Sequence, residues 1–195
     1  MVVILGTAHG SNVGGKCSPD GKFREYKWSR QMCRMIKEKL LLLGIECYID
    51  LEDDTELSLK DRVHRVNSIC KVKGASNCIY ISIHVNAGPE PKWSNATGCT
   101  VFVYRNGSEK SKRLALCYHN TAEELDLLGN RCFPPTKYFE SGLYVCKNTL
   151  CPAILTENEF MTTKASVDWL ESDEGKETIC DLHIKTIQKY LENEQ

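Results

Sequence analysis

Residues 78–84 of the chain read Cys-Ile-Tyr-Ile-Ser-Ile-His. A short, mainly apolar run that stops at a polar residue is typical of a strand buried within a sheet. Two other apolar runs end in a similar way: residues 2–5 are followed, after Gly-Thr-Ala, by His9, and residues 152–156 lead directly into Glu157. Three separate predicted strands therefore each lead to a side chain that can bind a metal ion or carry a proton.

Helical patterns alternate with these strands. Apolar residues between positions 23 and 43 recur at spacings of three and four, which predicts an amphipathic helix, and Ser58 can cap a second helix that runs to about Val72. Additional strands are expected over residues 45–50, 98–105 and 143–145, and additional helices over residues 108–128 and 171–192. This alternation indicates an α/β fold: a single-domain, twisted, mostly parallel sheet flanked by helices, over residues 1–195.

The composition is that of an ordinary globular protein, with 42% hydrophobic and 26% charged residues among 195. A formal net charge of −1 argues against nucleic-acid binding, which usually requires a strong basic excess. No run approaches the roughly 18 apolar residues that a membrane helix needs, so we expect no membrane partner. Neither composition nor charge indicates an oligomeric state.

Eleven cysteines are many for a chain of this size, and their odd number leaves at least one of them unpaired. Most lie within apolar patterns, where a free thiol packs as a small hydrophobic group. The sequence contains no Cys-x-x-Cys pair, which argues against a zinc ribbon or a thioredoxin-type site. We therefore expect structural thiols and no disulfide framework.

Function in open α/β sheets gathers beyond the carboxyl ends of the parallel strands, so His9, His84 and Glu157 are expected to meet at one edge. Glu25 lies three residues before Trp28 on the apolar stripe of its helix, and a carboxylate facing a core is costly unless it is paired or binds a metal. Each residue taken singly also has an ordinary structural interpretation, such as a turn histidine or a helix-start glutamate. Together, two histidines and one carboxylate leave a fourth position open, as in catalytic zinc sites, and Glu157 could take a proton from water.

At these positions the chain resembles the zinc-dependent N-acetylmuramoyl-L-alanine amidases, and the resemblance covers nearly the whole chain. The Ser-Ile-His-x-Asn-Ala pattern of that family is intact at residues 82–87, and its Pro-Ala-x-Leu-x-Glu pattern is present at residues 152–157. Residues 8–10, Ala-His-Gly, are similar to the Gly-His-Gly turn of the family, and Glu25 matches a glutamate early in the following helix. Three further matches precede the third strand: Leu59, Arg62 and Asn67.

The resemblance implies a hydrolase that cleaves the amide bond between N-acetylmuramic acid and L-alanine in peptidoglycan. It implies one catalytic Zn²⁺ bound by His9, Glu25 and His84, with Glu157 as the catalytic carboxylate. The partner is then a muramyl peptide of the cell wall. Because no signal peptide is visible, we expect synthesis in the cytoplasm and action on the wall after release, as for a prophage-type lysin, unless an export signal has been removed.

The sequence departs from the family pattern at a few positions. Gly6-Thr7 stands where an Asp-Pro pair is common, so an aspartate that could orient the first histidine is missing. Glu159 stands where the family has a small or apolar residue. Its carboxylate is expected either to raise the pKa of Glu157 or to point away from it. Asn86 follows a ligand closely and is expected either to bind substrate or to brace its loop.

Three other functions remain open from the sequence. A cysteine hydrolase would use Cys17 or Cys151 as nucleophile with a histidine as base, although neither has a supporting local motif. A zinc carboxypeptidase would use the same metal ligands on a peptide. A non-catalytic cell-wall-binding module would keep the fold without the chemistry, and the intact set of four residues argues against it.

Overall fold

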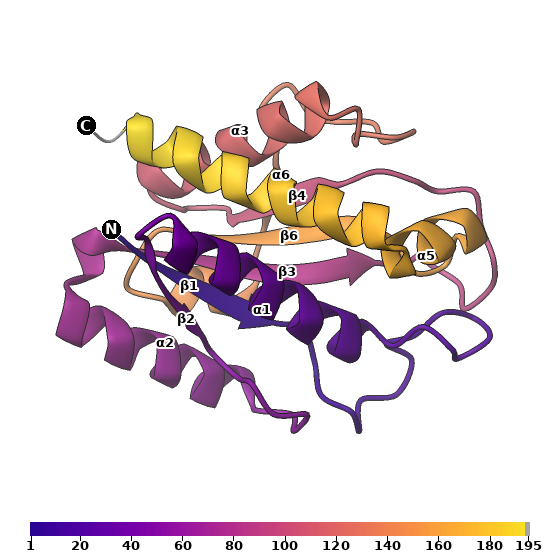
Figure 1. The fold of residues 1–195 in the computed structure, drawn as a ribbon, viewed down its shortest axis with the longest axis horizontal. Coiled ribbons are helices and arrows are strands. Elements are labelled where there is room, and N and C mark those ends of the chain that lie inside the picture. The colour runs from indigo at the N-terminus through magenta and orange to yellow at the C-terminus, as the bar shows by residue number, and fades with distance from the viewer. Residues whose placement is uncertain (194–195) are drawn as a thin grey trace.

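The computed structural model describes residues 1–193, and its central feature is a sheet of six strands (Figure 1). The strands lie in the order β2-β1-β3-β6-β4-β5, and every neighbouring pair is parallel except β4 and β6. Their bounds are β1 Val2–Thr7, β2 Glu46–Ile49, β3 Cys78–Asn86, β4 Thr100–Tyr104, β5 Phe139–Ser141 and β6 Ala153–Phe160. The predicted α/β fold with a mostly parallel sheet is confirmed.

Helices cover both faces of this sheet (Figure 1). Helices α1, α3 and α6 pack on one face, with α6 lying between the other two, whereas α2 and α4 pack on the opposite face. The helix bounds are α1 Glu25–Leu42, α2 Leu59–Lys73, α3 Glu109–Glu124, α4 Tyr144–Asn148, α5 Lys164–Glu171 and α6 Asp173–Glu192, with a 3₁₀ turn over Ala75–Asn77. Ser58 caps α2 as predicted, because its Oγ accepts a hydrogen bond from the Asp61 N–H at 3.1 Å.

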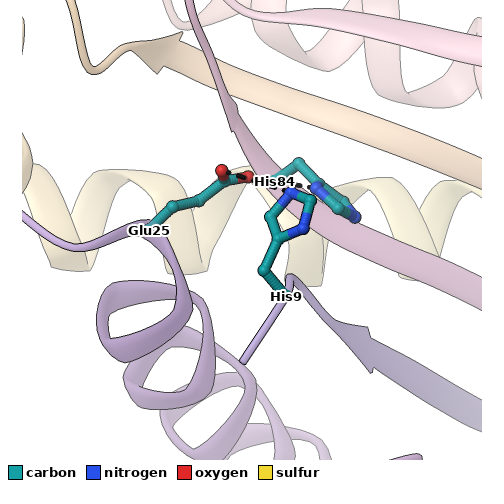
Figure 2. Close-up of side chains that lie close together, drawn as sticks. All are labelled: His9, Glu25 and His84. Carbon is teal, nitrogen blue, oxygen red and sulfur yellow. Dashed lines mark hydrogen bonds and ion pairs between the residues drawn. The ribbon is translucent and has the colours of Figure 1, made fainter. Parts of the chain in front are cut away.

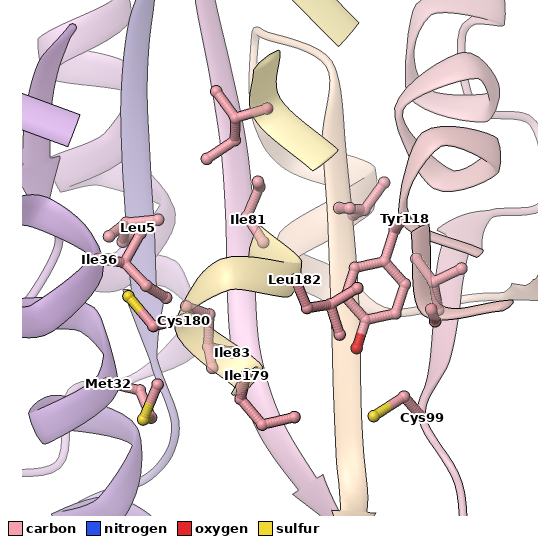
Figure 3. Close-up of a cluster of buried hydrophobic side chains, with 14 of the residues drawn as sticks. Leu5, Met32, Ile36, Ile81, Ile83, Cys99, Tyr118, Ile179, Cys180 and Leu182 are labelled. Carbon is pink, nitrogen blue, oxygen red and sulfur yellow. The ribbon is translucent and has the colours of Figure 1, made fainter. Parts of the chain in front are cut away.

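The central strands are buried on both faces, as expected for a parallel sheet covered by helices. In β1, Val3 and Leu5 belong to the core beneath α1, α3 and α6, whereas Val2 and Ile4 belong to the core beneath α2. Because successive side chains on a strand point to opposite faces, one apolar strand supplies both cores. Figure 3 shows the larger core, in which strand residues such as Ile81 face side chains from the helices.

Two strands are longer than predicted, and this changes where the site residues lie. β3 extends to Asn86 and β6 extends to Phe160, so His84 and Glu157 lie inside their strands and not just after them. The two strands stay paired through these residues, and their register shifts only between His84 and Asn86. Polar residues continue the strands because backbone hydrogen bonds pair them regardless of side chain.

The strand predicted over residues 143–145 is wrong. Tyr144 begins the short helix α4, and the strand in this region is β5, which lies closer to the amino terminus. A run of three apolar residues has no distinguishing period, so a helix and a strand fit it equally well. The helix is favoured here because Val145 and Cys146 pack into the core beneath α2, and Asn67 of α2 donates to the Asn148 carbonyl at 3.0 Å.

All eleven cysteines are free thiols, and nine of them are buried. Burial raises the pKa of Cys47, Cys99 and Cys146 to about 12, so these thiols are protonated and unreactive near neutral pH. They pack as small hydrophobic groups, as the sequence predicts. Among the described residues, no helix combines the length and the apolar character needed to cross a membrane.

Candidate metal centre

The three side chains predicted to bind a metal come together at one end of the sheet (Figure 2). His9 follows β1, Glu25 is the first residue of α1, and His84 lies near the end of β3. One ligand atom from each side chain lies within 4.8 Å of the others. Within residues 1–193, no other group of three or more histidine, cysteine, aspartate or glutamate side chains is clustered in this way.

The spacing of the ligand atoms suits a zinc ion. Glu25 Oε1 lies 3.0 Å from His84 Nδ1, and Glu25 Oε2 lies 3.5 Å from His9 Nε2. Two ligands held about 2.0–2.1 Å from zinc in tetrahedral geometry are themselves about 3.3 Å apart. Two imidazoles and one carboxylate form a donor set that zinc accepts, and they leave one position for water or substrate. These residues therefore fit a catalytic zinc ion.

The protonation states of two of the three side chains, His9 and Glu25, also favour a cation. Burial lowers the pKa of His9 to about 4 against the opposing charge of Glu25, so this imidazole is neutral near pH 7. Burial acts to raise the pKa of Glu25, but the hydrogen bond and charge of His84 outweigh it and hold that pKa below its ordinary value. Burial likewise acts to lower the pKa of His84, yet Glu25 raises it overall. A metal ion at this site therefore competes with the proton that His84 shares with Glu25.

The turn that carries His9 has an enforced backbone conformation. His9 has a φ of 42°, in the left-handed region that residues other than glycine rarely adopt. Arg30 Nη1 donates to the Ala8 carbonyl at 2.9 Å, and a Cβ at Gly10 would lie 2.4 Å from the backbone nitrogen of Glu56. Such a conformation persists only where the surroundings enforce it. The turn therefore requires glycine at position 10 and keeps the imidazole over the site.

A single hydroxyl connects the three segments that carry the ligands. Ser29 lies one helical turn after Glu25, and its Oγ accepts a hydrogen bond from the Ala8 N–H at 2.9 Å and donates one to the Ile83 carbonyl at 2.6 Å. Ala8 and Ile83 directly precede the two histidines. Ser29 was not among the predicted site residues, although a serine on the apolar stripe of a helix is a signal that could have identified it.

Replacing Ser29 with alanine should weaken zinc binding by about 10- to 100-fold, the range typical of residues that orient metal ligands. Ser29 is fully buried, so the Ala8 N–H and the Ile83 carbonyl would each lose this hydrogen bond and the segments that carry the predicted ligands could shift. Competition with a chromophoric chelator measures the affinity. Ser68→Ala is the matched control, because Ser68 is exposed and bonds only to its own helix. Equal zinc affinity in wild type and Ser29→Ala would show that this hydroxyl does not position the ligands.

Glu157 faces the same side of the sheet as His84, because the two residues are register partners on adjacent strands. The residue is half-buried, and its Oε2 atom is shielded from solvent without a hydrogen-bond partner in the described part of the chain. Burial is the main cause that raises the pKa of Glu157 to about 7; the negative charge of Glu25 adds to it and His84 opposes it. A shielded carboxylate with a pKa near neutrality is suited to accept and return a proton.

A buried network that was not among the predicted site residues supports the end of β1. Asp50 lies just after β2, and its carboxylate accepts hydrogen bonds from the Thr7 N–H at 3.0 Å, Arg62 Nη1 at 2.8 Å and the Tyr80 hydroxyl at 3.1 Å. A Cβ at Gly6 would lie 2.1 Å from the Tyr80 hydroxyl oxygen, so this ring fills the space that a side chain at position 6 needs. A carboxylate that directly follows β2 therefore fixes the end of β1, where the sequence lacks the aspartate expected from the family resemblance.

Two further polar residues near the site are engaged within the protein. Glu159 has a φ of 60°, and its carboxylate accepts hydrogen bonds from the Gly98 N–H at 2.9 Å and the Ser166 hydroxyl at 2.8 Å. Glu159, which departs from the family pattern, therefore connects the segment just before β4 to α5. Asn86 Oδ1 accepts a hydrogen bond from the Ala87 N–H at 2.8 Å, which favours a bracing role in its loop.

Comparison with known proteins places this geometry in a family. The model of the N-acetylmuramoyl-L-alanine amidase family matches residues 3–189 of the chain. That range contains all four predicted site residues and all six strands except the first residue of β1. The match therefore extends over the whole fold and is not confined to one motif.

Individual proteins are also similar to this chain over most of its length. The chain is 26% identical over 191 residues to the uncharacterized protein YqiI of Bacillus subtilis, covering 97% of this chain and 84% of that protein. It is 22% identical over 204 residues to the germination-specific N-acetylmuramoyl-L-alanine amidase of the same organism, covering 97% and 79%. The crystal structure of an N-acetylmuramoyl-L-alanine amidase from Clostridium difficile 630 has the same fold, with a TM-score of 0.85, 23% identity, and coverage of 100% of this chain and 98% of that one.

Proposed function

This chain belongs to the N-acetylmuramoyl-L-alanine amidase family, and from that premise we propose that His9, Glu25 and His84 bind one catalytic zinc ion while Glu157 acts as the general base. As a member of this family, the chain is a hydrolase of the amide bond between N-acetylmuramic acid and L-alanine in peptidoglycan. One observation carries the residue assignment: three ligand atoms cluster within 4.8 Å at the strand ends where Glu157 has a shielded, unpaired oxygen.

Each residue has a defined role in this reaction. His9, Glu25 and His84 would hold the ion, and three protein ligands would leave a fourth position for water or substrate. When bound, the ion supplies Lewis acidity, which polarises a carbonyl and lowers the pKa of water towards about 7. Glu157 accepts the proton of the attacking water and then donates it to the nitrogen of the leaving L-alanine. In the metal-free protein burial raises the pKa of this carboxylate to about 7, which suits a group that first accepts a proton and then donates it.

The cysteine-hydrolase alternative is not favoured at Cys151. Cys151 is buried, and the hydrogen bond with Cys70 together with burial holds its pKa above the ordinary value, so it does not supply a thiolate. The carboxypeptidase and wall-binding alternatives are not favoured by the family assignment. We infer instead that residues 1–195 act as one catalytic domain on a muramyl peptide, and that this action takes place in the cell wall after the protein has left the cytoplasm.

Digestion of purified sacculi tests the proposed function. The zinc-loaded protein should release peptides with a free L-alanine amino terminus and leave glycan strands without peptides, because only the lactyl–alanine amide is cut. A carboxypeptidase would instead shorten the peptides from the other end and leave them attached to muramic acid. Mass analysis of the fragments separates the two outcomes, and a parallel digestion with a chelator should yield neither product. Shortened peptides still joined to muramic acid would contradict the proposal.

A further inference from the structure

A cavity of about 170 Å³ lies beside the metal centre, and the chemistry described above does not use it. Both ligand histidines form part of its wall, which places it within reach of a substrate bound at the metal. The cavity is also lined by Arg62 and by apolar side chains: Leu59, Leu143, Val145 and Leu155. The charge of Arg62 is paired on one side with the buried Asp50 carboxylate, so the hydrogen bonds on its other side decide whether the guanidinium group can take a second partner.

The hydrogen bonds of Arg62 leave one edge of its guanidinium group without a partner. Arg62 is 3% exposed. Its hydrogen bonds all come from Nη1, which donates to Asp50 Oδ2 at 2.8 Å and to Thr7 Oγ1 at 3.3 Å. Nε and Nη2 donate to no residue among positions 1–193. These two nitrogens carry parallel N–H groups along one side of the guanidinium plane, the arrangement that binds a carboxylate in a bidentate manner.

The surrounding charges permit an anion at this edge. Asp50 is buried against Nη1, so it is already engaged on another side of the guanidinium group. Glu56 also lines the cavity, but it is exposed, and solvent screens its charge. None of the other side chains in the wall is a carboxylate. No buried negative charge therefore faces the free edge of Arg62 within the described residues.

From this geometry we propose that Arg62 binds a substrate carboxylate two residues from the scissile bond. The inference rests on the proposed amidase function. In a peptidoglycan stem peptide, the second residue is a glutamate joined through its side-chain carboxyl, which leaves its α-carboxyl free. Two extended residues span about 7 Å, a reach that suits a pocket adjoining the metal ligands. The apolar residues of the cavity contact the aliphatic part of that glutamate, and Arg62 selects its charge.

Two matched substrates test this inference without any change to the protein. They are muramyl tripeptides that differ only in the α-carboxyl of the second residue, which is free in one and amidated in the other. Wild type should cleave the free acid with a kcat/KM at least about tenfold higher, because an amide cannot accept both charge-assisted hydrogen bonds. If the cavity binds any oxygen acceptor, the enzyme would instead cleave the free-acid and the amidated substrate with equal kcat/KM. That result would overturn the inference.

A conservative variant ties the preference to the residue. Arg62→Lys keeps the charge beside Asp50 but lacks the bidentate edge, so the preference should fall below about threefold. Arg65→Lys is the matched control, since Arg65 is exposed on the same helix and does not line the cavity. Thermal unfolding of Arg62→Lys first establishes that it folds, and the two-substrate comparison in wild type remains decisive if it does not.

Binding to the metal-free protein gives a readout that is independent of catalysis. The cleaved tripeptide with a free α-carboxyl should bind the metal-free wild type at least about tenfold more tightly than its amidated counterpart, and Arg62→Lys should reduce that difference to below about threefold. Equal binding of the two peptides to wild type would contradict the carboxylate subsite. Absence of cleavage of either muramyl tripeptide by the zinc-loaded enzyme would count against the amidase function itself, so the two failures are distinguishable.

Discussion

Replacing Glu157 with glutamine should lower the rate of amide cleavage at least about 100-fold, the lower end for residues that transfer protons in catalysis. Glutamine has nearly the same shape but cannot accept the proton of water, so zinc binding and substrate binding should remain close to normal. Steady-state cleavage of a muramyl peptide measures the loss, and metal analysis checks the zinc content. If Glu157→Gln binds one zinc and keeps near-normal turnover, Glu157 is not the general base.

The same substitution should have the opposite effect on the stability of the metal-free protein. The pKa of Glu157 is raised in the folded state from 4.5 to about 7, so the folded chain holds a proton that the unfolded chain releases. Wild type therefore loses stability as the pH rises through this window, by up to about 3 kcal/mol, whereas glutamine cannot ionise. Glu157→Gln should match wild type near pH 4.5 and unfold at a higher temperature at pH 8. Loss of stability at both pH values would indicate a folding defect and not a catalytic one.

Replacing His84 with alanine should abolish both zinc binding and catalysis. Two ligands remain, and Glu25 loses the partner that lies 3.0 Å from its Oε1 while it stays fully buried. We expect zinc affinity to fall by more than about 100-fold, exceeding the effect of losing an orienting residue such as Ser29. Equilibrium dialysis with metal analysis measures the affinity.

The matched control is His64→Ala, since His64 is exposed on α2 and is not part of the cluster. Chelation of wild-type zinc should reproduce the inactivity of His84→Ala, and restored zinc should reverse it in wild type alone. Undiminished zinc affinity in His84→Ala would mean that the ion binds elsewhere. With eleven cysteines in the chain, a thiolate site is the alternative that most needs exclusion.

Much of the fold follows from local features of the sequence. The apolar runs that lead to His9, His84 and Glu157 are buried β-strands, and their parallel order brings those residues to one edge. Glu25 was recognisable because it lies on the apolar side of a helix, where a carboxylate needs a partner. Periodicity thus predicts which side chains face inward, and strand order determines that they meet.

Features that depend on long-range packing were not predictable in this way. The sequence predicts that the strand ends before Glu157, yet pairing with β3 continues β6 to Phe160. Ser29 and Asp50 are ordinary polar residues until two other segments approach them with unpaired backbone groups. Likewise, the free edge of Arg62 depends on where β2 ends, because Asp50 occupies the other side of its guanidinium group.

Zinc X-ray absorption of the reconstituted protein tests the central claim most directly. If His9, Glu25 and His84 bind the ion, one equivalent of zinc should show only nitrogen and oxygen neighbours at about 2.0–2.2 Å, with imidazole scattering from two rings. A cysteine site would show sulfur neighbours at about 2.3 Å. A sulfur shell, or an unchanged spectrum when His9 and His84 are both replaced by alanine, would contradict the proposed metal centre.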